Sequence, residues 1–279
     1  MDKEVIMELD KIIEEFIERS KVFVEFSCYL PGLKDSIDGI KTIRQVYDHE
    51  YLAFVKSAKT LVSIKSLLQI GHNEDVFVLI RGILENYITA RYLNENVNDI
   101  SDFEIIERFI QNKIKVDLGI LEVKYPNLID SKGQIVSKLD KISHLVLGLD
   151  RKYFKDFYSF LSKFTHLDFS ILDYYIDENK SFSLYKENDI VLVRLYTVFV
   201  FTKLFECIVT VEGEDFYDEE EERKCYELVN KSLLLQRKVF GNLIDELNKY
   251  PSIKNDQLKD MLKEMNNSLE DSIGSIDKS

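Results

Sequence analysis

The segment that most constrains the fold covers residues 73–93, NEDVFVLIRGILENYITARYL, which is apolar around its whole circumference at helical spacing. A helix without a polar face is normally a buried central helix. Arg81 and Glu85 lie within it, four residues apart, so their side chains stack about 40° apart on one face. Because buried charges are costly unless they are paired, the segment predicts a buried Arg81–Glu85 ion pair inside a helical core.

Helical spacing of apolar residues recurs along almost the whole chain, whereas strand patterns are nearly absent and no internal repeat is visible. The three prolines, Pro31, Pro126 and Pro251, fall where helices are expected to begin or end. The expected helices cover approximately residues 3–29, 40–70, 73–93, 101–114, 134–147, 150–166 and 188–211, then a long helix that starts in the acidic run of residues 212–222 and continues to residue 250, and a final stretch after Pro251. The sequence therefore predicts an all-α protein, a bundle of about seven to nine helices with two buried central helices.

Several residues are expected to mark helix boundaries. Gly71 is expected to close the helix before it, and Asn73 to cap the central helix. Ser101 and Glu104 form an S-x-x-E capping box, and Asp150 is expected to cap a later helix. Two irregular segments are predicted, a loop over residues 125–133 and a long loop or lid over residues 167–187.

The second central helix is expected near residues 190–211, a strongly apolar stretch interrupted by Arg194, Lys203 and Glu206. A charge in the middle of a membrane span costs roughly 2.5–3.5 kcal/mol for Arg or Lys. The stretch is therefore interpreted as a buried core helix rather than a membrane span.

The overall composition is that of an acidic globular protein, with a formal net charge of −13. This charge argues against a broad basic surface for nucleic acid, although it leaves room for a small basic site. Cys28, Cys207 and Cys225 share no CxxC spacing and are interpreted as reduced thiols. The N-terminus is charged and helical rather than typical of a secretory signal. A cytoplasmic protein without membrane contact is expected.

The chain is predicted to have two parts: a helical core domain over residues 1–211, and an acidic helix with a C-terminal amphipathic helix over residues 212–279, packed on that core. The acidic run over residues 212–222 suits a helix start, where the macrodipole favours negative charge. The last helix places apolar residues on one face, which would pack on the body or on a partner chain: Leu258, Met261, Leu262, Met265 and Leu269.

No familiar catalytic motif stands out. The four histidines form no HExxH or related zinc motif, so no metal is predicted. Glycine-rich phosphate loops and GxSxG elbows are also lacking, and no cofactor is predicted.

One candidate site combines the Arg81–Glu85 pair with a later helix. Tyr158, Ser162 and His166 are spaced by four residues and therefore share one stripe of that helix. His166 falls at the helix C-terminus, where the dipole favours a protonated imidazole. In the catalytic interpretation His166 is an acid/base, Arg81 clamps an anion and Glu85 orients Arg81. The alternatives are a histidine that caps helix carbonyls and an ion pair that only sets helix packing.

A second candidate is the R-x4-H spacing of Arg44 and His49. Ribonucleases of the HEPN type carry an arginine and a histidine four to six residues apart, and the paired motifs of a dimer attack RNA without a metal. Chance matches to so short a pattern are common in a chain of this composition. Arg44 and His49 are therefore kept as alternative catalytic residues.

The two longer motifs carry a resemblance. The segment LIRGILE at residues 79–85 and the segment LSKFTH at residues 161–166 resemble an uncharacterised family of all-helical bacterial proteins with an LxRxxxE helix and a distal YxxxSxxxH helix. That family is similar in helical character to HEPN-like proteins of bacterial defence and toxin loci. The resemblance spans about residues 50–210 and implies that Arg81, Glu85, Tyr158, Ser162 and His166 converge. It also implies a homodimer.

Three functions follow as hypotheses. The first is a defence- or toxin-associated HEPN-like effector that acts on RNA or a nucleotide, as a metal-independent ribonuclease. The second is a helical interaction module without chemistry, which binds a protein partner through its acidic or C-terminal helices. In that case Arg81→Ala costs about 3–5 kcal/mol by stranding a buried Glu85. The third is a sensor of a small ligand with residues 167–187 as a lid.

Overall fold

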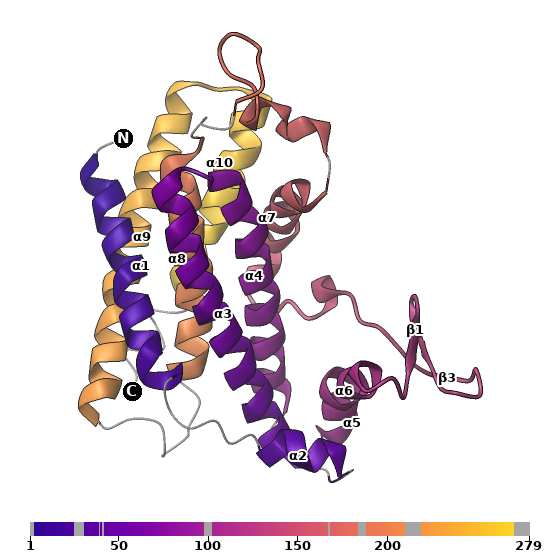
Figure 1. Cartoon of the computed structure of the whole chain (residues 1–279). Coiled ribbons are helices and arrows are strands. Elements are labelled where there is room, and N and C mark those ends of the chain that lie inside the picture. Colours follow the sequence, from indigo (N-terminus) through magenta and orange to yellow (C-terminus); the bar gives the residue numbers. More distant parts are fainter. Residues whose placement is uncertain are drawn as a thin grey trace.

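The structure is a computed structural model, which describes residues 3–24, 31–38, 40, 42–97, 102–166, 168–183, 188–209 and 219–270. Helices dominate these ranges, and the sheet that they contain is small and three-stranded. The prediction of an all-α multi-helix bundle is therefore confirmed (Figure 1). The long helices that build the bundle are α1 (Lys3–Val24), α3 (Arg44–Ile70), α4 (Asn73–Asn96), α7 (Asp150–Thr165), α8 (Ile190–Val209), α9 (Glu219–Lys249) and α10 (Ile253–Asn267).

Helix α8 lies at the centre of the bundle, in contact with α1, α3, α4 and α9. Every residue from Val191 to Phe205 is buried, as expected for a core helix. The two basic residues that interrupt its apolar sequence meet acidic partners from neighbouring helices. Arg194 Nε donates to Asp10 Oδ1 of α1 over 2.7 Å, and Lys203 Nζ lies 3.1 Å from Asp150 Oδ1 of α7.

Within the described ranges, none of the helices is both long enough and apolar enough to cross a membrane.

Helix α4 is the second central helix, but it is not buried all round. The side chains of Arg81 and Glu85 are 22% and 40% exposed, so the prediction of a buried pair is wrong. Val78 and Leu79, which make the sequence look apolar on every side, are themselves only partly buried. Periodicity cannot distinguish a partly covered apolar stripe from a fully covered one, and α4 keeps a stripe that solvent reaches.

The helix boundaries match the expected signals only in part. Gly71 closes α3 with φ 80°, and its N–H donates to Leu67 O, as predicted. Asn73 does not cap α4; it is the first helical residue, and its side-chain amide donates to Asn188 O over 2.6 Å. The position predicted to cap α7, Asp150, is instead the first residue of that helix, and its carboxylate is bound by other side chains. Ser101 lies outside the described residues.

A smaller helical layer follows α4. It consists of α5 (Phe103–Ile106), a π-helical turn η2 (Glu107–Gln111) and α6 (Asn112–Asp117). This layer packs against the start of α3, where the short helix α2 (Pro31–Ile37) also lies. The layer has an apolar cluster of its own, made by Val46, Leu93, Val97, Phe103, Ile106 and Ile110.

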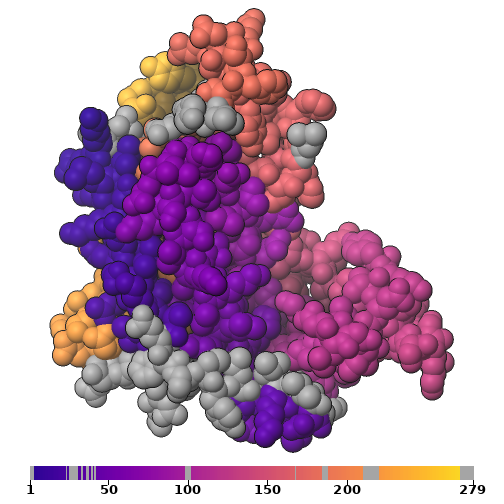
Figure 2. All heavy atoms as spheres, viewed as in Figure 1, coloured from indigo at the N-terminus to yellow at the C-terminus, as the bar shows by residue number. Residues whose placement is uncertain are grey.

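The segment after α6 is an arm, defined as residues 118–141, and here the predicted helix over residues 134–147 is wrong. The chain forms an antiparallel sheet of β1 (Glu122–Lys124), β2 (Asn127–Ile129) and β3 (Ile135–Lys138), followed by a 3-10 turn, η3 (Ile142–His144). Turns at Pro126 and at Gly133, with φ 78°, separate strands of three or four residues. Such strands are too short for alternation to reveal. The arm projects from the side of the bundle (Figure 2).

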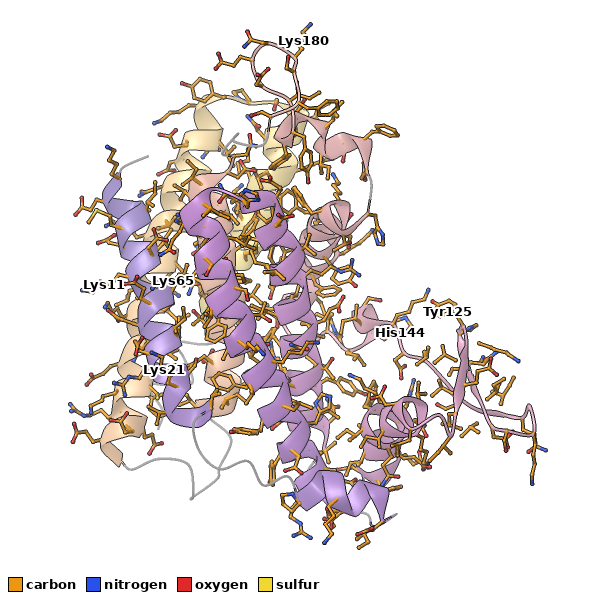
Figure 3. The ribbon with its side chains drawn as sticks, viewed as in Figure 1. Lys11, Lys21, Lys65, Tyr125, His144 and Lys180 are labelled. Atoms are coloured by element: carbon orange, nitrogen blue, oxygen red, sulfur yellow. The ribbon has the colours of Figure 1, made fainter. Side chains whose placement is uncertain are left out.

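The predicted loop over residues 167–187 contains a 3-10 helix, η4 (Phe169–Tyr174), and an isolated bridge between Ile176 and Phe182. Residues 167 and 184–187 of that prediction lie outside the described residues. Figure 3 shows Lys180 at the tip of the loop, beyond the end of the bundle, and Tyr125 far away on the arm.

The C-terminal helices pack on the rest of the bundle. Helix α9 contacts α8 and α1, and α10 contacts α7 and α9. The predicted apolar face of α10 is confirmed: Leu258 is partly buried and the other residues of the face are buried, namely Met261, Leu262, Met265 and Leu269. Residues 25–29 of the predicted first helix and residues 212–218 of the acidic run lie outside the described residues. The division at residues 211/212 stays a prediction.

Candidate functional site

Three polar clusters of the described residues are candidates for a functional site. The first is the one that the sequence predicts. Arg81 Nε donates to Glu85 Oε1 over 3.1 Å, and its terminal nitrogens donate to the hydroxyls of Tyr158 over 2.7 Å and Thr165 over 2.5 Å. The Tyr158 hydroxyl in turn donates to Glu85 Oε1 over 2.7 Å. Burial raises the pKa of Tyr158, and the hydrogen bond to Glu85 adds to this effect. The structure thus brings Arg81, Glu85 and Tyr158 together, and adds Thr165.

The other two predicted members lie at the edge of this cluster. The Ser162 hydroxyl donates to the backbone carbonyl of Tyr158 over 2.6 Å, so it turns back onto its own helix. His166 follows the last residue of α7 in extended backbone conformation and is exposed. Arg81 donates to Thr165, the residue that precedes His166 in the sequence. Among the described residues, no hydrogen bond joins His166 itself to Arg81.

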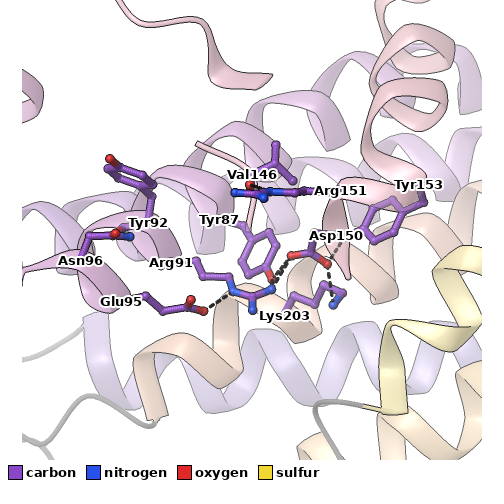
Figure 4. Close-up of polar contacts among 10 residues, drawn as sticks. All are labelled: Tyr87, Arg91, Tyr92, Glu95, Asn96, Val146, Asp150, Arg151, Tyr153 and Lys203. Atoms are coloured by element: carbon purple, nitrogen blue, oxygen red, sulfur yellow. Dashed lines mark hydrogen bonds and ion pairs between the residues drawn. The ribbon is translucent and has the colours of Figure 1, made fainter. Parts of the chain in front are cut away.

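The second cluster is a buried ionic network, which the sequence prediction did not identify as a site (Figure 4). It centres on Asp150 at the start of α7. Its Oδ2 accepts from the Tyr87 hydroxyl and from Arg91 Nη1, both over 2.6 Å. Its Oδ1 accepts from the Tyr153 hydroxyl over 2.7 Å and lies 3.1 Å from Lys203 Nζ. Helices α4, α7 and α8 are therefore joined through one carboxylate.

The electrostatics of the network favour a charged Asp150. Burial by itself would raise the pKa of Asp150, but Lys203, Arg91 and the two tyrosine hydroxyls lower it below its usual range. Burial, and then the negative charge of Asp150, hold the pKa of Tyr87 and Tyr153 well above the usual value. All four donors thus serve a carboxylate that is closed off from solvent, which is a structural arrangement rather than a substrate site.

The network carried only a weak sequence signal. Lys203 stands out as a charge in an apolar helix, and Arg91 follows Tyr87 by one helical turn. The acid that joins them comes from a different helix, and its position suited an N-cap equally well. Spacing within one helix cannot show which distant carboxylate completes such a network.

The third cluster lines a pocket of about 500 Å³ between α3, α4 and the layer formed by η2 and α6. This volume lies in the range of small-molecule sites, about 300–1,000 Å³. Apolar residues form one part of the lining, namely Leu52, Ala53, Ile110 and Ile114. Polar and charged residues form the remainder, namely Gln45, Asp48, His49, Lys56, Asn86, Lys113 and Asp117.

Two lining side chains have polar atoms that the protein leaves unpaired. His49 Nδ1 and Gln45 Oε1 are buried and have no hydrogen-bond partner among the described residues. Burial, with the positive charge of Lys113, lowers the pKa of His49 to about 4. His49 is therefore neutral at physiological pH. A neutral imidazole is able to donate one hydrogen bond and to accept one. Buried polar atoms without partners are uncommon and point to a missing hydrogen-bonding group.

The R-x4-H pair is not brought together within this chain. Arg44 pairs with Asp35 Oδ2 of α2 over 3.0 Å at the exposed start of α3. His49 is five residues further on, so the two side chains are about 140° apart around the helix. His49 faces the pocket, whereas Arg44 is not among the residues that line it.

A metal site needs several ligand side chains close together. Across the ranges that the structure describes, no group of three or more His, Cys, Asp or Glu side chains is arranged to hold a metal ion.

Comparison with known protein families gives a match to part of the chain. Residues 50–144, about a third of the chain, match a family of unknown function, DUF5677. No curated protein and no solved structure matches the chain. The matched segment contains Arg81 and Glu85 of the predicted site and most of the pocket lining, while His49, Tyr158 and His166 lie outside it.

Proposed function

We propose that this protein binds a small phosphate-bearing ligand of the mononucleotide class in the pocket between α3, α4 and α6. The observation that carries this proposal is a pocket of about 500 Å³ whose lining combines apolar side chains with two exposed lysines, Lys56 and Lys113.

The distribution of chemistry in the pocket fits an amphipathic ligand. The apolar residues Leu52, Ile110 and Ile114 suit a ring, while the polar lining residues His49 and Asn86 suit its edge. Lys56 and Lys113 are exposed lining residues and can bind an anion. In this role the lysines hold the phosphate, and the apolar and polar lining residues hold the ring.

Binding has a specific electrostatic consequence. Lys113 contributes to the low pKa of His49, about 4 in the free protein. A phosphate bound at Lys113 would offset that positive charge and favour the imidazolium. We therefore expect the pKa of His49 to rise on binding, which ¹H–¹³C NMR of the imidazole measures.

A thermal-shift panel tests the proposal. Purified protein is heated with each of the four common nucleoside monophosphates and with inorganic phosphate. At least one nucleotide should raise the Tm, and Lys113→Ala should weaken its binding by about tenfold or more, the effect of one lost charge-assisted contact. Lys59→Ala, at an exposed lysine of α3 outside the pocket, is the matched control. The proposal is wrong if no nucleotide shifts the Tm, or if both variants lose binding equally.

A second function, an HEPN-like effector that cleaves RNA in a defence or toxin system, is proposed for the Arg81 cluster. A specific observation favours it: Arg81 and Glu85 are partly exposed beside an exposed His166, so a macromolecule can reach all three. Arg81 uses three N–H groups on protein partners, and a guanidinium has five. Two remain for a phosphate, with His166 as the acid/base.

RNA cleavage by purified protein tests this second function, with total and transfer RNA and with a chelator present. His166→Ala should abolish chelator-resistant cleavage, whereas His144→Ala, at an exposed histidine of η3, should not. Cleavage that survives in His166→Ala would refute the assignment, and so would an inactive wild type.

A further inference from the structure

The arm carries an unusual amount of exposed apolar surface. Leu118, Tyr125 and Ile135 are 57%, 73% and 63% exposed, and Ile120, Val123, Val136 and Leu139 are exposed as well. Seven large apolar side chains thus face solvent within a segment of residues 118–141. Contiguous apolar surface of this kind marks interaction sites in soluble proteins. Figure 3 shows Tyr125 on the part of the arm that extends away from the bundle.

The sheet of the arm also has an open edge. The strand order is β1-β2-β3, so in the described part of the chain β1 pairs with β2 on one side and with no strand on the other. All three residues of β1, Glu122, Val123 and Lys124, are exposed. An exposed edge presents backbone N–H and C=O groups to which another strand can be added.

The sequence of β1 is complementary to itself. In an antiparallel pair of two copies centred on Val123, each Glu122 lies opposite Lys124 of the other copy. Two opposite-charge cross-strand pairs result, and such pairs stabilise a sheet. The other edge lacks this property, because β3 centred on Val136 would place Ile135 opposite Ser137.

Charge also favours a second copy as the occupant. The whole chain has a net charge of −13, so two copies repel each other over most of their surface. The arm instead has four lysines (Lys124, Lys132, Lys138 and Lys141) against three acidic residues (Glu122, Asp130 and Asp140), a net charge of +1. Two copies meet with least repulsion at this arm.

We propose that the protein dimerises through antiparallel pairing of two β1 strands, centred on Val123. This interface is independent of the proposed ligand and of the Arg81 cluster. It joins two arms into one six-stranded antiparallel sheet, and it covers the apolar side chains next to β1.

Sedimentation equilibrium of the full chain tests the interface by charge exchange. Glu122→Lys and Lys124→Glu each place like charges opposite each other twice per dimer, and each should raise the dimer Kd by about tenfold or more. The double variant Glu122→Lys/Lys124→Glu restores both pairs with reversed sign and should bring Kd back to within about threefold of wild type. Lys138→Glu, on the opposite edge strand, should leave Kd unchanged.

A second variant fixes the register. Val123→Cys places two thiols opposite each other on the symmetry axis, within the Cα separation that a disulfide needs. Mild oxidation should give a covalent dimer that Glu122→Lys suppresses, with the wild-type chain under the same oxidant as the baseline. The proposal is overturned by a wild type that stays monomeric to about 1 mM. It is overturned equally by a double variant no better than the single ones, or by a dimer that Lys138→Glu breaks.

Discussion

Helix α4 contributes one arginine to each of two polar clusters shared with α7, and the carboxylates of the two clusters differ in how much water reaches them. Arg81 and Glu85 are partly exposed, and their partners Tyr158 and Thr165 keep access to solvent. One and a half turns beyond Glu85, by contrast, the Asp150 carboxylate is fully buried, although its donor Arg91 is 22% exposed, as Arg81 is. Both clusters combine an arginine, a carboxylate and a tyrosine hydroxyl, joined by hydrogen bonds of similar length.

Burial therefore separates their roles. A closed carboxylate with four donors holds helices in place and is costly to disturb. An open guanidinium with two N–H groups to spare contributes little to stability and remains available to an anion. The Asp150 network therefore has a structural role, whereas the Arg81 cluster is available for the second proposed function.

The largest expected effect comes from removing the central carboxylate. Asp150→Ala leaves the buried Lys203 without its ion-pair partner and removes one partner of Arg91, so the free energy of unfolding should fall by about 3–5 kcal/mol. Urea denaturation measures this, with Asp156→Asn, an exposed acid of the same helix, as the control that should change little. A loss below about 1 kcal/mol would contradict the assignment of a structural role.

A pH experiment tests a second buried acid, Glu50. Glu50 is buried on α3, and burial raises its pKa to about 8. The folded protein then binds a proton that the unfolded chain has released, so stability should fall as the pH rises from about 4.5 to 8. His49, with a pKa of about 4, acts in the opposite direction only below about pH 6.5.

The window between pH 6.5 and 8 thus isolates Glu50. The wild type should lose about 2 kcal/mol there, and Glu50→Gln should lose almost none. Denaturant titrations at several pH values measure the slope, and the exposed Glu104→Gln serves as control. Equal slopes in Glu50→Gln and wild type would show that Glu50 is already ionised.

The smallest effect is expected at the open cluster. Arg81→Ala removes three hydrogen bonds, but its partners can turn to water, so the cost should be about 1 kcal/mol. A buried pair would cost about 3–5 kcal/mol. Arg223→Ala, in an exposed pair with Glu227 at the same spacing, provides the lower limit. A loss as large as that of Asp150→Ala would erase the distinction between the clusters.

Much of the bundle was predictable because long helices carry a repeated signal. The apolar spacing in α4, α8 and α10 extends over four or more turns, so their positions follow from periodicity. The convergence of Arg81 with Tyr158 was also predicted, from the resemblance rather than from spacing. The partial exposure of this cluster was not predicted, because exposure depends on which neighbouring element covers each stripe of the helix.

The arm and the pocket show what local patterns leave out. Strands of three or four residues, with turns at Pro126 and Gly133, carry too little alternation to outweigh the helical signals around them. The pocket joins His49 to residues such as Asn86 and Lys113, which lie on other elements. Contacts of this kind follow from the tertiary fold and have no short-range signature.

The pocket itself can be tested most directly by blocking it. Leu52 lines the pocket and is exposed, so Leu52→Trp should obstruct the pocket without disturbing the core. Val62→Trp adds the same bulk at an exposed position on α3 outside the pocket. Calorimetric titration with nucleoside monophosphates should show one binding site in wild type and in Val62→Trp, and a loss of affinity of about tenfold or more in Leu52→Trp. Equal affinity in all three proteins, or no binding by wild type, would contradict the proposed ligand site.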